Sequence, residues 1–336
     1  MNGFEVHTAE KYLCIMPTFQ CTAECTHCGT VSSPRDDTWL PDDLMNDAID
    51  EAAAAGFRGI VFTGGEPTLA GDKLFTAMRR AALRGLPLRI VTNGHWAAGE
   101  ESAARWIENL VSAGLSEINL STGDQHSRFV SLDNIFHATR ASVAAGVATV
   151  IMVECVRERS VSKEAVESDV RFRAILDDYP YAPLTVLESV WSPLSPSRVQ
   201  EYPTNVAVDK TNLAQRRGCE SIFLAPTVQP DGRISPCCGL GIRFVPELQI
   251  GNIGEVTILK ASSEAEGDFL KQWIHLEGPE HILAWAATID PSIEWENMYA
   301  HHCQACIRLF RDQKVRKVIA EWGAARFAEL VEAEVL

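Results

Sequence analysis

The first two thirds of the chain alternate between short apolar segments typical of strands and longer segments with helical spacing. The strand-like segments cover residues 12–18, 59–63, 88–92, 117–121, 148–156 and 184–190. The helix-like segments cover residues 42–55, 73–83, 102–113, 134–145 and 164–177. Gly56, Gly85, Gly114 and Gly146 stand where four of the helices should end. This alternation predicts parallel strands that are joined by right-handed crossovers.

Six strand–helix units predict an α/β fold with an open, partial (β/α)6 barrel, because a complete TIM-like barrel would need two more units. A doubly wound sheet gives a similar pattern of elements, and the periodicity does not exclude it. We expect the barrel domain at residues 1–195, followed by a linker at 196–218, in a region that is rich in Pro and Ser.

Residues 219–336 differ in character and predict a small α+β domain. Apolar segments at 222–227 and 233–236 flank Gln229-Pro230-Asp231-Gly232, a sequence typical of a hairpin turn. A long helix is expected to close the chain at roughly 306–332.

The composition narrows the function classes. With 336 residues, of which 46% are hydrophobic, the chain can bury a full core. A net charge of −15 argues against general affinity for nucleic acid or for an anionic membrane. The sequence has neither a signal-peptide pattern nor an apolar run near the ~20 residues that span a bilayer, so we expect a cytoplasmic location.

Ten cysteines are many for a cytosolic chain of this length. Secreted disulfide frameworks are the alternative, but they are usually short and have small cores, whereas these cysteines fall in spaced groups that favour metal ligation. Cys21, Cys25 and Cys28 have the spacing C-x3-C-x2-C, which lets three thiolates hold three irons of a 4Fe–4S cluster and leave the fourth iron open. A zinc knuckle or buried thiols are the alternatives. Zinc takes four ligands, and the candidate fourth, His27, lies awkwardly between two of the cysteines.

The second strand-like segment ends in Thr63-Gly64-Gly65-Glu66-Pro67. Together with the three cysteines, this stretch resembles the radical S-adenosylmethionine (SAM) superfamily, and the resemblance covers about residues 11–310. It implies a cluster whose open iron binds SAM, reductive cleavage of SAM to a 5′-deoxyadenosyl radical, and abstraction of a hydrogen atom from the substrate. An ordinary βα turn is the alternative for the glycine-rich stretch.

The resemblance also implies which residues hold SAM. The segment Gly64, Gly65, Glu66 and Pro67 would bind the amino group of its methionine part, with the Glu66 carboxylate accepting a hydrogen bond from the ammonium. His27 stands where relatives usually have an aromatic residue, which often packs near the adenine.

Two further strand ends point to the same face of the barrel, where active-site groups gather. Thr92 and Asn93 end the third strand. At the end of the fourth strand, the resemblance implies that Ser121 bonds the ribose and that Arg128 pairs with the methionine carboxylate. A surface salt bridge is the alternative for Arg128. Asp124 departs from the Ser-x-Asp-Gly sequence of relatives, which leaves its role open.

Cys219, Cys237, Cys303 and Cys306 form a second spaced group. With the hairpin between them, they resemble the C-terminal extension of SPASM and twitch radical SAM enzymes, in the shorter twitch form with one auxiliary cluster. Four thiolates would ligate such a cluster completely and suit it for electron transfer rather than substrate binding. A zinc site from the same thiolates is the alternative, and Cys238 could replace Cys237 as a ligand.

Three cysteines have no ligand role in this scheme. Cys14 lies early in a strand and is expected to be a buried small hydrophobe. Cys155 ends the fifth strand and is a candidate hydrogen-atom donor, with a packing role as the alternative; Cys238 is a second candidate donor if Cys237 is the ligand. Glu154 and Glu188 also end strands on this face and are candidate contacts for substrate or adenine.

These features favour an enzyme that modifies a ribosomally made peptide by crosslinking or epimerisation. A small-molecule dehydrogenase or epimerase of sugar, aminocyclitol or other natural-product biosynthesis is the alternative, as is a non-catalytic iron–sulfur or zinc scaffold. The chain begins close to the first strand, so no leader-binding domain is expected before the barrel. An electron donor such as flavodoxin or ferredoxin is the expected partner.

Overall fold

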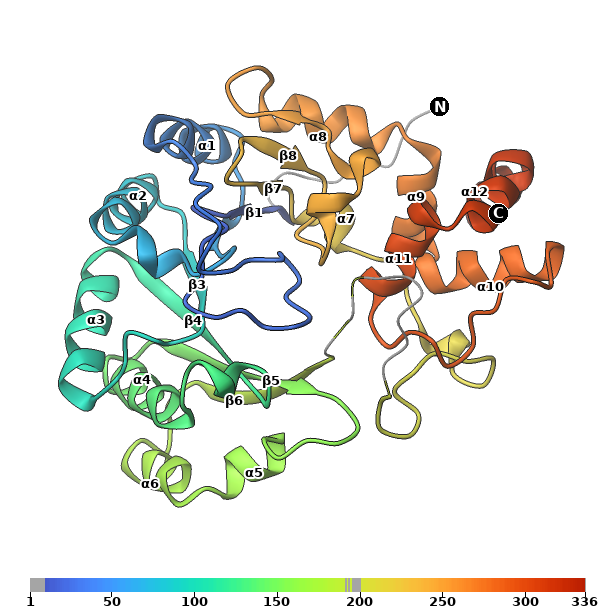
Figure 1. Cartoon of the computed structure of the whole chain (residues 1–336). Helices are drawn as coiled ribbons and strands as arrows, with labels where there is room; N and C mark the ends of the chain where they lie inside the picture. Colours follow the sequence, from blue (N-terminus) through green and yellow to red (C-terminus); the bar gives the residue numbers. More distant parts are fainter. Residues whose placement is uncertain (1–9, 191, 193, 195–200, 336) are drawn as a thin grey trace.

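The computed structural model describes residues 10–190, 192, 194 and 201–335 (Figure 1). Of residues 333–335 it describes the backbone alone. Its nine-stranded sheet has the order β6-β5-β4-β3-β2-β1-β7-β8-β9. Its first six strands are β1 (Tyr12–Ile15), β2 (Gly59–Phe62), β3 (Leu88–Thr92), β4 (Leu115–Thr122), β5 (Ala148–Cys155) and β6 (Leu184–Val190). All neighbouring pairs among these six strands are parallel.

The helices between these strands cover the outer face of the curved sheet (Figure 1). They are α1 (Asp42–Ala54), α2 (Asp72–Leu83), α3 (Glu100–Ser112), α4 (Leu132–Ala144), α5 (Lys163–Ser168) and α6 (Val170–Asp178). Because the strand order is sequential and never reverses, the doubly wound alternative is excluded. The predicted partial (β/α)6 barrel is confirmed.

Alternation along the strands divides the barrel into a packed outer layer and an open inner face. In β3, Leu88, Ile90 and Thr92 are buried, whereas Arg89 and Val91 on the other face are only partly covered. Short turns return the chain to the sheet, and at Gly114 (φ +101°) an added Cβ would lie 2.6 Å from the Ala82 Cβ. Because the six strands are parallel, their carboxyl ends lie at the same edge of the sheet.

The C-terminal part extends the same sheet through a hairpin. β7 (Thr227–Val228) pairs in parallel with β1 and antiparallel with β8 (Arg233–Ser235), and β9 (Gly251–Asn252) follows. The predicted hairpin is confirmed, but the strand expected to begin at residue 222 is wrong in its first part. Ser221–Leu224 form the helix α7, which buries Ile222 and Phe223 side by side and ends before Pro226.

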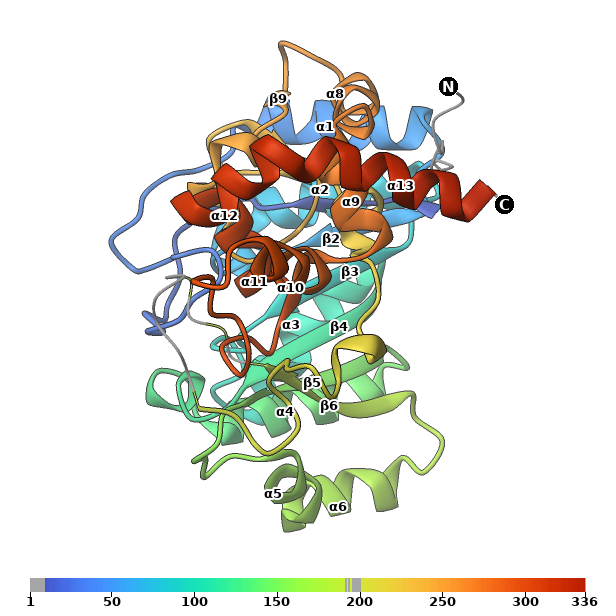
Figure 2. The same ribbon diagram turned by 90° about the vertical axis from the view of Figure 1, so that its right-hand side faces the viewer.

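One of the remaining helices, α8 (Ile258–Glu266), packs on the core of the barrel, to which its Ile258 and Ala261 belong. The others pack around a second core that contains Trp273. They are α9 (Phe269–Leu276), α10 (Pro279–Ile289), α11 (His302–Arg311), α12 (Gln313–Val318), the π-helix η7 (Ile319–Gly323) and α13 (Ala324–Val335). Short 3-10 helices occur at Pro67–Ala70, His126–Arg128, Leu213–Gln215, Ile242–Phe244 and Pro246–Leu248. Figure 2 shows α12 and α13 running across the face of this part. No helix in the described part of the chain combines the length and the apolar character that crossing a membrane requires.

Two predicted helices are each divided by an aspartate. The long helix expected at 306–332 breaks at Asp312, whose backbone is extended and whose carboxylate accepts hydrogen bonds from the Lys314 and Val315 amides. The helix expected at 164–177 breaks in the same way at Asp169, which caps Arg171. Aspartate prefers the position before a helix because its side chain satisfies free amide groups there.

The expected linker is partly packed. Within it, Val208 is fully buried, and its amide donates to the Tyr299 carbonyl at 2.6 Å. Residues 195–200 of the barrel end and linker lie outside the described residues, so the boundaries at 195 and 218 stay a prediction.

Candidate active site

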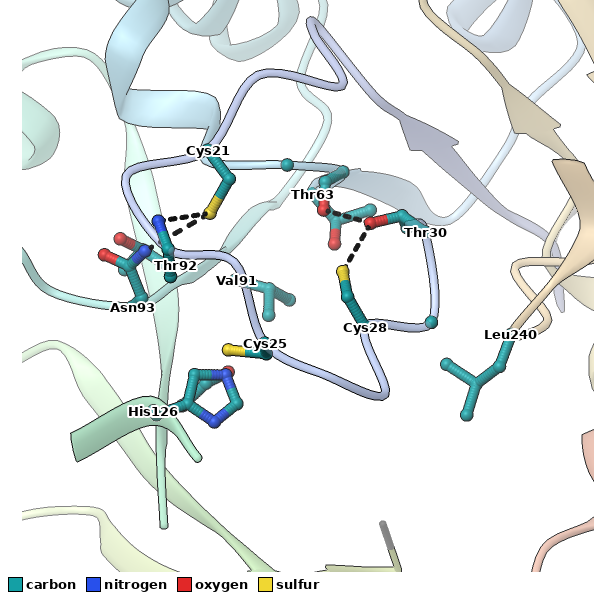
Figure 3. Close-up of a pocket in the computed structure, with 15 residues that line it drawn as sticks. Cys21, Cys25, Cys28, Thr30, Thr63, Val91, Thr92, Asn93, His126 and Leu240 are labelled. Carbon is teal, nitrogen blue, oxygen red and sulfur yellow. Dashed lines mark hydrogen bonds between the residues drawn. The ribbon is translucent and has the colours of Figure 1, made fainter. Parts of the chain in front are cut away.

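The loop between β1 and α1 gathers three of the cysteines at one cavity. The loop folds back on itself, with the Cys21 amide donating to the Ser33 carbonyl at 3.2 Å and the Cys28 amide to the Cys25 carbonyl at 3.1 Å. All three thiols line a cavity of about 250 Å³ (Figure 3). His27 is half-buried in the same loop but does not belong to the described lining of this cavity.

Hydrogen-bond donors surround these thiols. The Asn93 side-chain amide lies 3.6 Å from the Cys21 sulfur, and the Ser32 amide lies 3.4 Å from the Cys28 sulfur. Burial raises the pKa of the Cys21 and Cys25 thiols to about 12. The Cys21 and Cys25 thiols therefore keep their protons at neutral pH unless a bound metal replaces them. The Asn93 and Ser32 amides would then stabilise the negative sulfurs of Cys21 and Cys28.

The reduction potential of a cluster at this site is expected to fall when Asn93 is replaced by alanine. The lost N–H···S hydrogen bond stabilises the more negative reduced state. If it contributes about 1 kcal/mol, the fall is ~40 mV for a one-electron couple. Redox titration followed by electron paramagnetic resonance (EPR) measures it. In the control, Asn134→Ala, the amide lost donates to the His95 carbonyl and not to a thiol, so an equal fall there would contradict the assignment.

The glycine-rich segment after β2 packs against the cysteine loop and lines the same cavity. The Gly65 amide donates to the Thr18 carbonyl at 2.9 Å, and a Cβ at Gly65 would lie 2.1 Å from the Gln20 oxygen. Gly64 has a φ of +117°. Glycine at these positions therefore permits the close approach of two backbone segments, which brings this segment beside the three cysteines.

Glu66 is fully buried and joins the ends of β2 and β3. One carboxylate oxygen accepts from the Thr68 amide and hydroxyl and from the Thr92 hydroxyl, at 3.2, 2.5 and 2.7 Å. The other accepts from the Asn93 amide at 2.9 Å. Pro67 is buried and begins the next 3-10 helix. Glu66 thus positions Thr92 and Asn93, which line the cavity, although Glu66 is not part of the described lining. Its contact with the ammonium of SAM stays a prediction.

The end of β4 contributes Ser121 to the cavity lining, and the 3-10 helix that follows contributes an unpredicted residue, His126. His126 Nδ1 lies 3.2 Å from an oxygen of Glu154, which is 4% exposed and also accepts from the Gln125 amide. A Cβ at Gly123 would lie 1.9 Å from the Glu154 Cγ, so this turn requires glycine. Gly123 and the buried Glu154 are the sequence features that could have pointed to this turn, and through it to His126.

Two predicted residues of this region lie elsewhere. The Asp124 carboxylate accepts from the Ser160 and Val161 amides, at 2.9 and 3.2 Å, and so holds the loop after β5. Arg128 is exposed and donates to the Gln125 side chain at 3.1 Å. Neither belongs to the described lining of the cavity, and their SAM contacts stay predictions.

The second group of cysteines lines another cavity, of about 260 Å³, which contains Cys219, Cys237, Cys238, Cys303 and Cys306. Burial and the neighbouring Cys237, Cys303 and Cys219 raise the pKa of Cys306 well above its usual range. Cys237 is buried, whereas the exposed Cys238 accepts a hydrogen bond from Cys14, which lowers the pKa of Cys238 to about 7. Cys237 and Cys238 therefore both lie at the cavity with the other three cysteines.

Cys155 and Glu188 lie outside the described lining of both cavities. Cys155 is 3% exposed, and burial followed by the nearby Glu188 raises its pKa. Glu188 forms an ion pair with Arg159 at 2.7 Å. Their predicted roles as hydrogen donor and substrate contact stay predictions.

Comparison with known sequences identifies the first part of the chain. Residues 15–153 match the family model of the radical SAM superfamily, so the chain contains a radical SAM domain. It is 32% identical to GTP 3′,8-cyclase of Mannheimia succiniciproducens over 133 residues, 38% of each chain. It is 26% identical to the putative peptide biosynthesis protein YydG of Bacillus subtilis, over 36% of this chain and 39% of YydG. The chain thus matches about two fifths of the length of these curated relatives.

Solved structures share the fold over a larger part. The structure of anSMEcpe with bound SAM has a TM-score of 0.55 at 15% identity and covers 96% of this chain and 98% of its own. SuiB of Streptococcus suis bound to SAM has a TM-score of 0.50 at 17% identity, over 74% of this chain and 64% of SuiB. At these identities the matches show a common fold, a partial barrel followed by a smaller C-terminal domain.

Proposed function

We infer from the radical SAM domain at residues 15–153 that this protein is an enzyme that cleaves SAM and modifies a ribosomally made peptide. The observation that carries the proposal is the single cavity at which Cys21, Cys25 and Cys28 meet the glycine-rich segment and the ends of β3 and β4. When bound, a 4Fe–4S cluster and SAM supply a 5′-deoxyadenosyl radical that removes a hydrogen atom from the substrate.

The residues of the cavity have distinct tasks in this proposal. The three thiolates hold the cluster, and Gly64 and Gly65 leave room for the methionine part of SAM. Glu66 fixes Thr92 and Asn93, and Ser121 and His126 border the remaining space.

A second cluster at Cys219, Cys237, Cys303 and Cys306 is part of the proposal, and with it a twitch-type domain. Cys237 is favoured over Cys238 because its sulfur and that of Cys303 lie 3.2 and 3.4 Å from the same point, the place that a Cβ at Gly239 would occupy. Cys238, which is exposed at the same cavity, is then favoured over the buried Cys155 as a hydrogen donor. All ten cysteines are free thiols, which fits the reducing cytoplasm. The proposed electron donor is a flavodoxin or a ferredoxin.

Two likenesses favour a peptide as the substrate. YydG is named a putative peptide biosynthesis protein, and anSMEcpe has been solved with a bound Cp18Cys peptide, at a TM-score of 0.53 to this chain. A small-molecule dehydrogenase or epimerase is the second candidate, because the relative with 32% identity is named for its action on GTP.

Incubating the reconstituted, reduced protein with SAM and short peptides encoded beside its gene, in deuterated water, tests the substrate class. We expect 5′-deoxyadenosine and a changed peptide mass. A gain of about one mass unit indicates epimerisation with an exchangeable donor, and a loss of about two indicates crosslinking or oxidation. If 5′-deoxyadenosine forms while every peptide stays unchanged, the small-molecule candidate replaces this proposal. If the gain of one mass unit is observed, the variants Cys238→Ser and Cys155→Ser identify the hydrogen donor, because the variant that lacks the donor thiol loses this gain.

A further inference from the structure

Leu240 lies between the two cysteine cavities. It lines the first cavity together with Cys28 and Gly29, and it also lines the second together with Cys237 and Cys303. No other described residue belongs to both linings. Figure 3 shows Leu240 reaching the first cavity from the side opposite Asn93. The two sites are therefore separated at this point by one side chain.

The backbone around Leu240 is held from the second site. The Leu240 amide donates to the Cys303 sulfur at 3.3 Å. The preceding residue, Gly239, packs closely against the same site, because a Cβ there would lie 3.2 Å from the Cys237 sulfur and 3.4 Å from that of Cys303. The contacts with Cys237 and Cys303 thus fix the backbone position of Leu240.

The segment around Leu240 also contacts the first cysteine loop. The Gly241 amide donates to the Gly29 carbonyl at 2.7 Å, one residue after Cys28. Arg243 pairs with Asp36 at 2.8 Å and lies 3.8 Å from the centre of the Phe19 ring. These contacts are made to both ends of the loop that holds the first three thiols.

Gly29 shows how closely the wall is packed. A Cβ at this position would lie 2.3 Å from the Cδ2 atom of Leu240 and 3.2 Å from its Cγ. A side chain at Gly29 would therefore displace Leu240. The second cavity lies on the opposite side of the Leu240 side chain.

We propose that Leu240 is a positioning residue that forms the common wall of the two cysteine sites and holds a substrate in the first cavity within one side chain of the auxiliary site. The inference rests on the proposed function. An auxiliary cluster held by the second group of cysteines would supply an acceptor for the electron that a substrate radical loses, with the proton released to solvent. Leu240 would then lie between the substrate and that acceptor.

The test needs no substrate. We reconstitute the full chain, reduce it with dithionite and record EPR spectra with and without SAM. The signal that responds to SAM belongs to the first cluster, and the signal that survives in the Cys21/Cys25/Cys28→Ala variant belongs to the auxiliary one. Leu240→Ala is expected to shift the g values of both signals, whereas Leu240→Met, which keeps the volume, leaves both unchanged.

Two alanine variants serve as matched controls because each side chain lines one cavity only. Val91→Ala is expected to shift only the first signal, and Leu248→Ala only the auxiliary one. A shift of only one signal in Leu240→Ala, or equal shifts of both signals in either control, overturns the proposal.

A double-mutant cycle tests the contact itself. In the Cys21/Cys25/Cys28→Ala background, Gly29→Ala is expected to shift the auxiliary signal, although Gly29 lies in the first loop. When Leu240→Ala is also present, Gly29→Ala should cause no further shift. Additive shifts, or no shift from Gly29→Ala, contradict the shared wall. If the wild type yields no 5′-deoxyadenosine but the cycle behaves as expected, the proposed function fails while the shared wall holds.

Discussion

Replacing Cys21, Cys25 and Cys28 together by alanine is expected to lower the iron content from about eight to about four atoms per chain, because each cubane cluster holds four. The fold should persist, since the three thiols are only partly buried and lie in a loop. The four remaining irons should give a reduced EPR signal that no longer responds to SAM. Iron analysis after anaerobic reconstitution measures the change.

The complementary variant provides the matched control. Replacing Cys219, Cys237, Cys303 and Cys306 should also leave about four irons, but these should respond to SAM. Cys155→Ala should leave all eight, because Cys155 lies outside the described lining of both cavities. An unchanged iron content in the triple variant would rule out a cluster at the first loop.

Replacing Glu66 by alanine is expected to destabilise the protein by about 4 kcal/mol or more, since four buried donors lose their acceptor and each costs about 1–3 kcal/mol. The donors left without Glu66 belong to Thr68, Thr92 and Asn93. Because Asn93 also donates to Cys21, iron binding at the first loop should weaken as well. Chemical denaturation of the apo chain measures the stability.

Glu101→Ala is the matched control for this change. Glu101 is an exposed carboxylate that pairs with Arg105 one helical turn away, and such pairs contribute about 0.3–0.5 kcal/mol. Glu66→Gln, which keeps one acceptor oxygen, should lie between the control and Glu66→Ala. A Glu66→Ala protein as stable as the control would show that the buried carboxylate does not hold β2 and β3 together.

The barrel could be predicted because its signals are local. Each strand is a short apolar run, and a glycine such as Gly114 ends the helix before the next strand. The cysteine spacing and the Gly64-Gly65 segment are equally local, and each follows a strand of the same parallel sheet, which places both at one edge of it. The structure places Cys21, Cys25, Cys28, Gly64 and Gly65 on one cavity.

The missed features depend on competition between local signals or on distant contacts. Asp312 sits inside a helical pattern, yet its carboxylate caps the next helix and breaks the predicted one. The hydrogen bonds that Glu66 accepts could not be predicted from the sequence, because their four donors come from side chains and backbone that only the fold brings together. Leu240 carries no sequence signal, since its position between two cavities follows from contacts to Gly29 and Cys303, far away in the sequence.

The central claim is that the first cavity cleaves SAM. The most direct measurement is the amount of 5′-deoxyadenosine formed when the reconstituted full chain is reduced with dithionite in the presence of SAM, beside the Cys21/Cys25/Cys28→Ala variant. The account predicts 5′-deoxyadenosine and methionine in equal amounts from the wild type and none above background from the variant. Equal amounts of 5′-deoxyadenosine from both proteins, or none from a wild type that holds about eight irons, would contradict it.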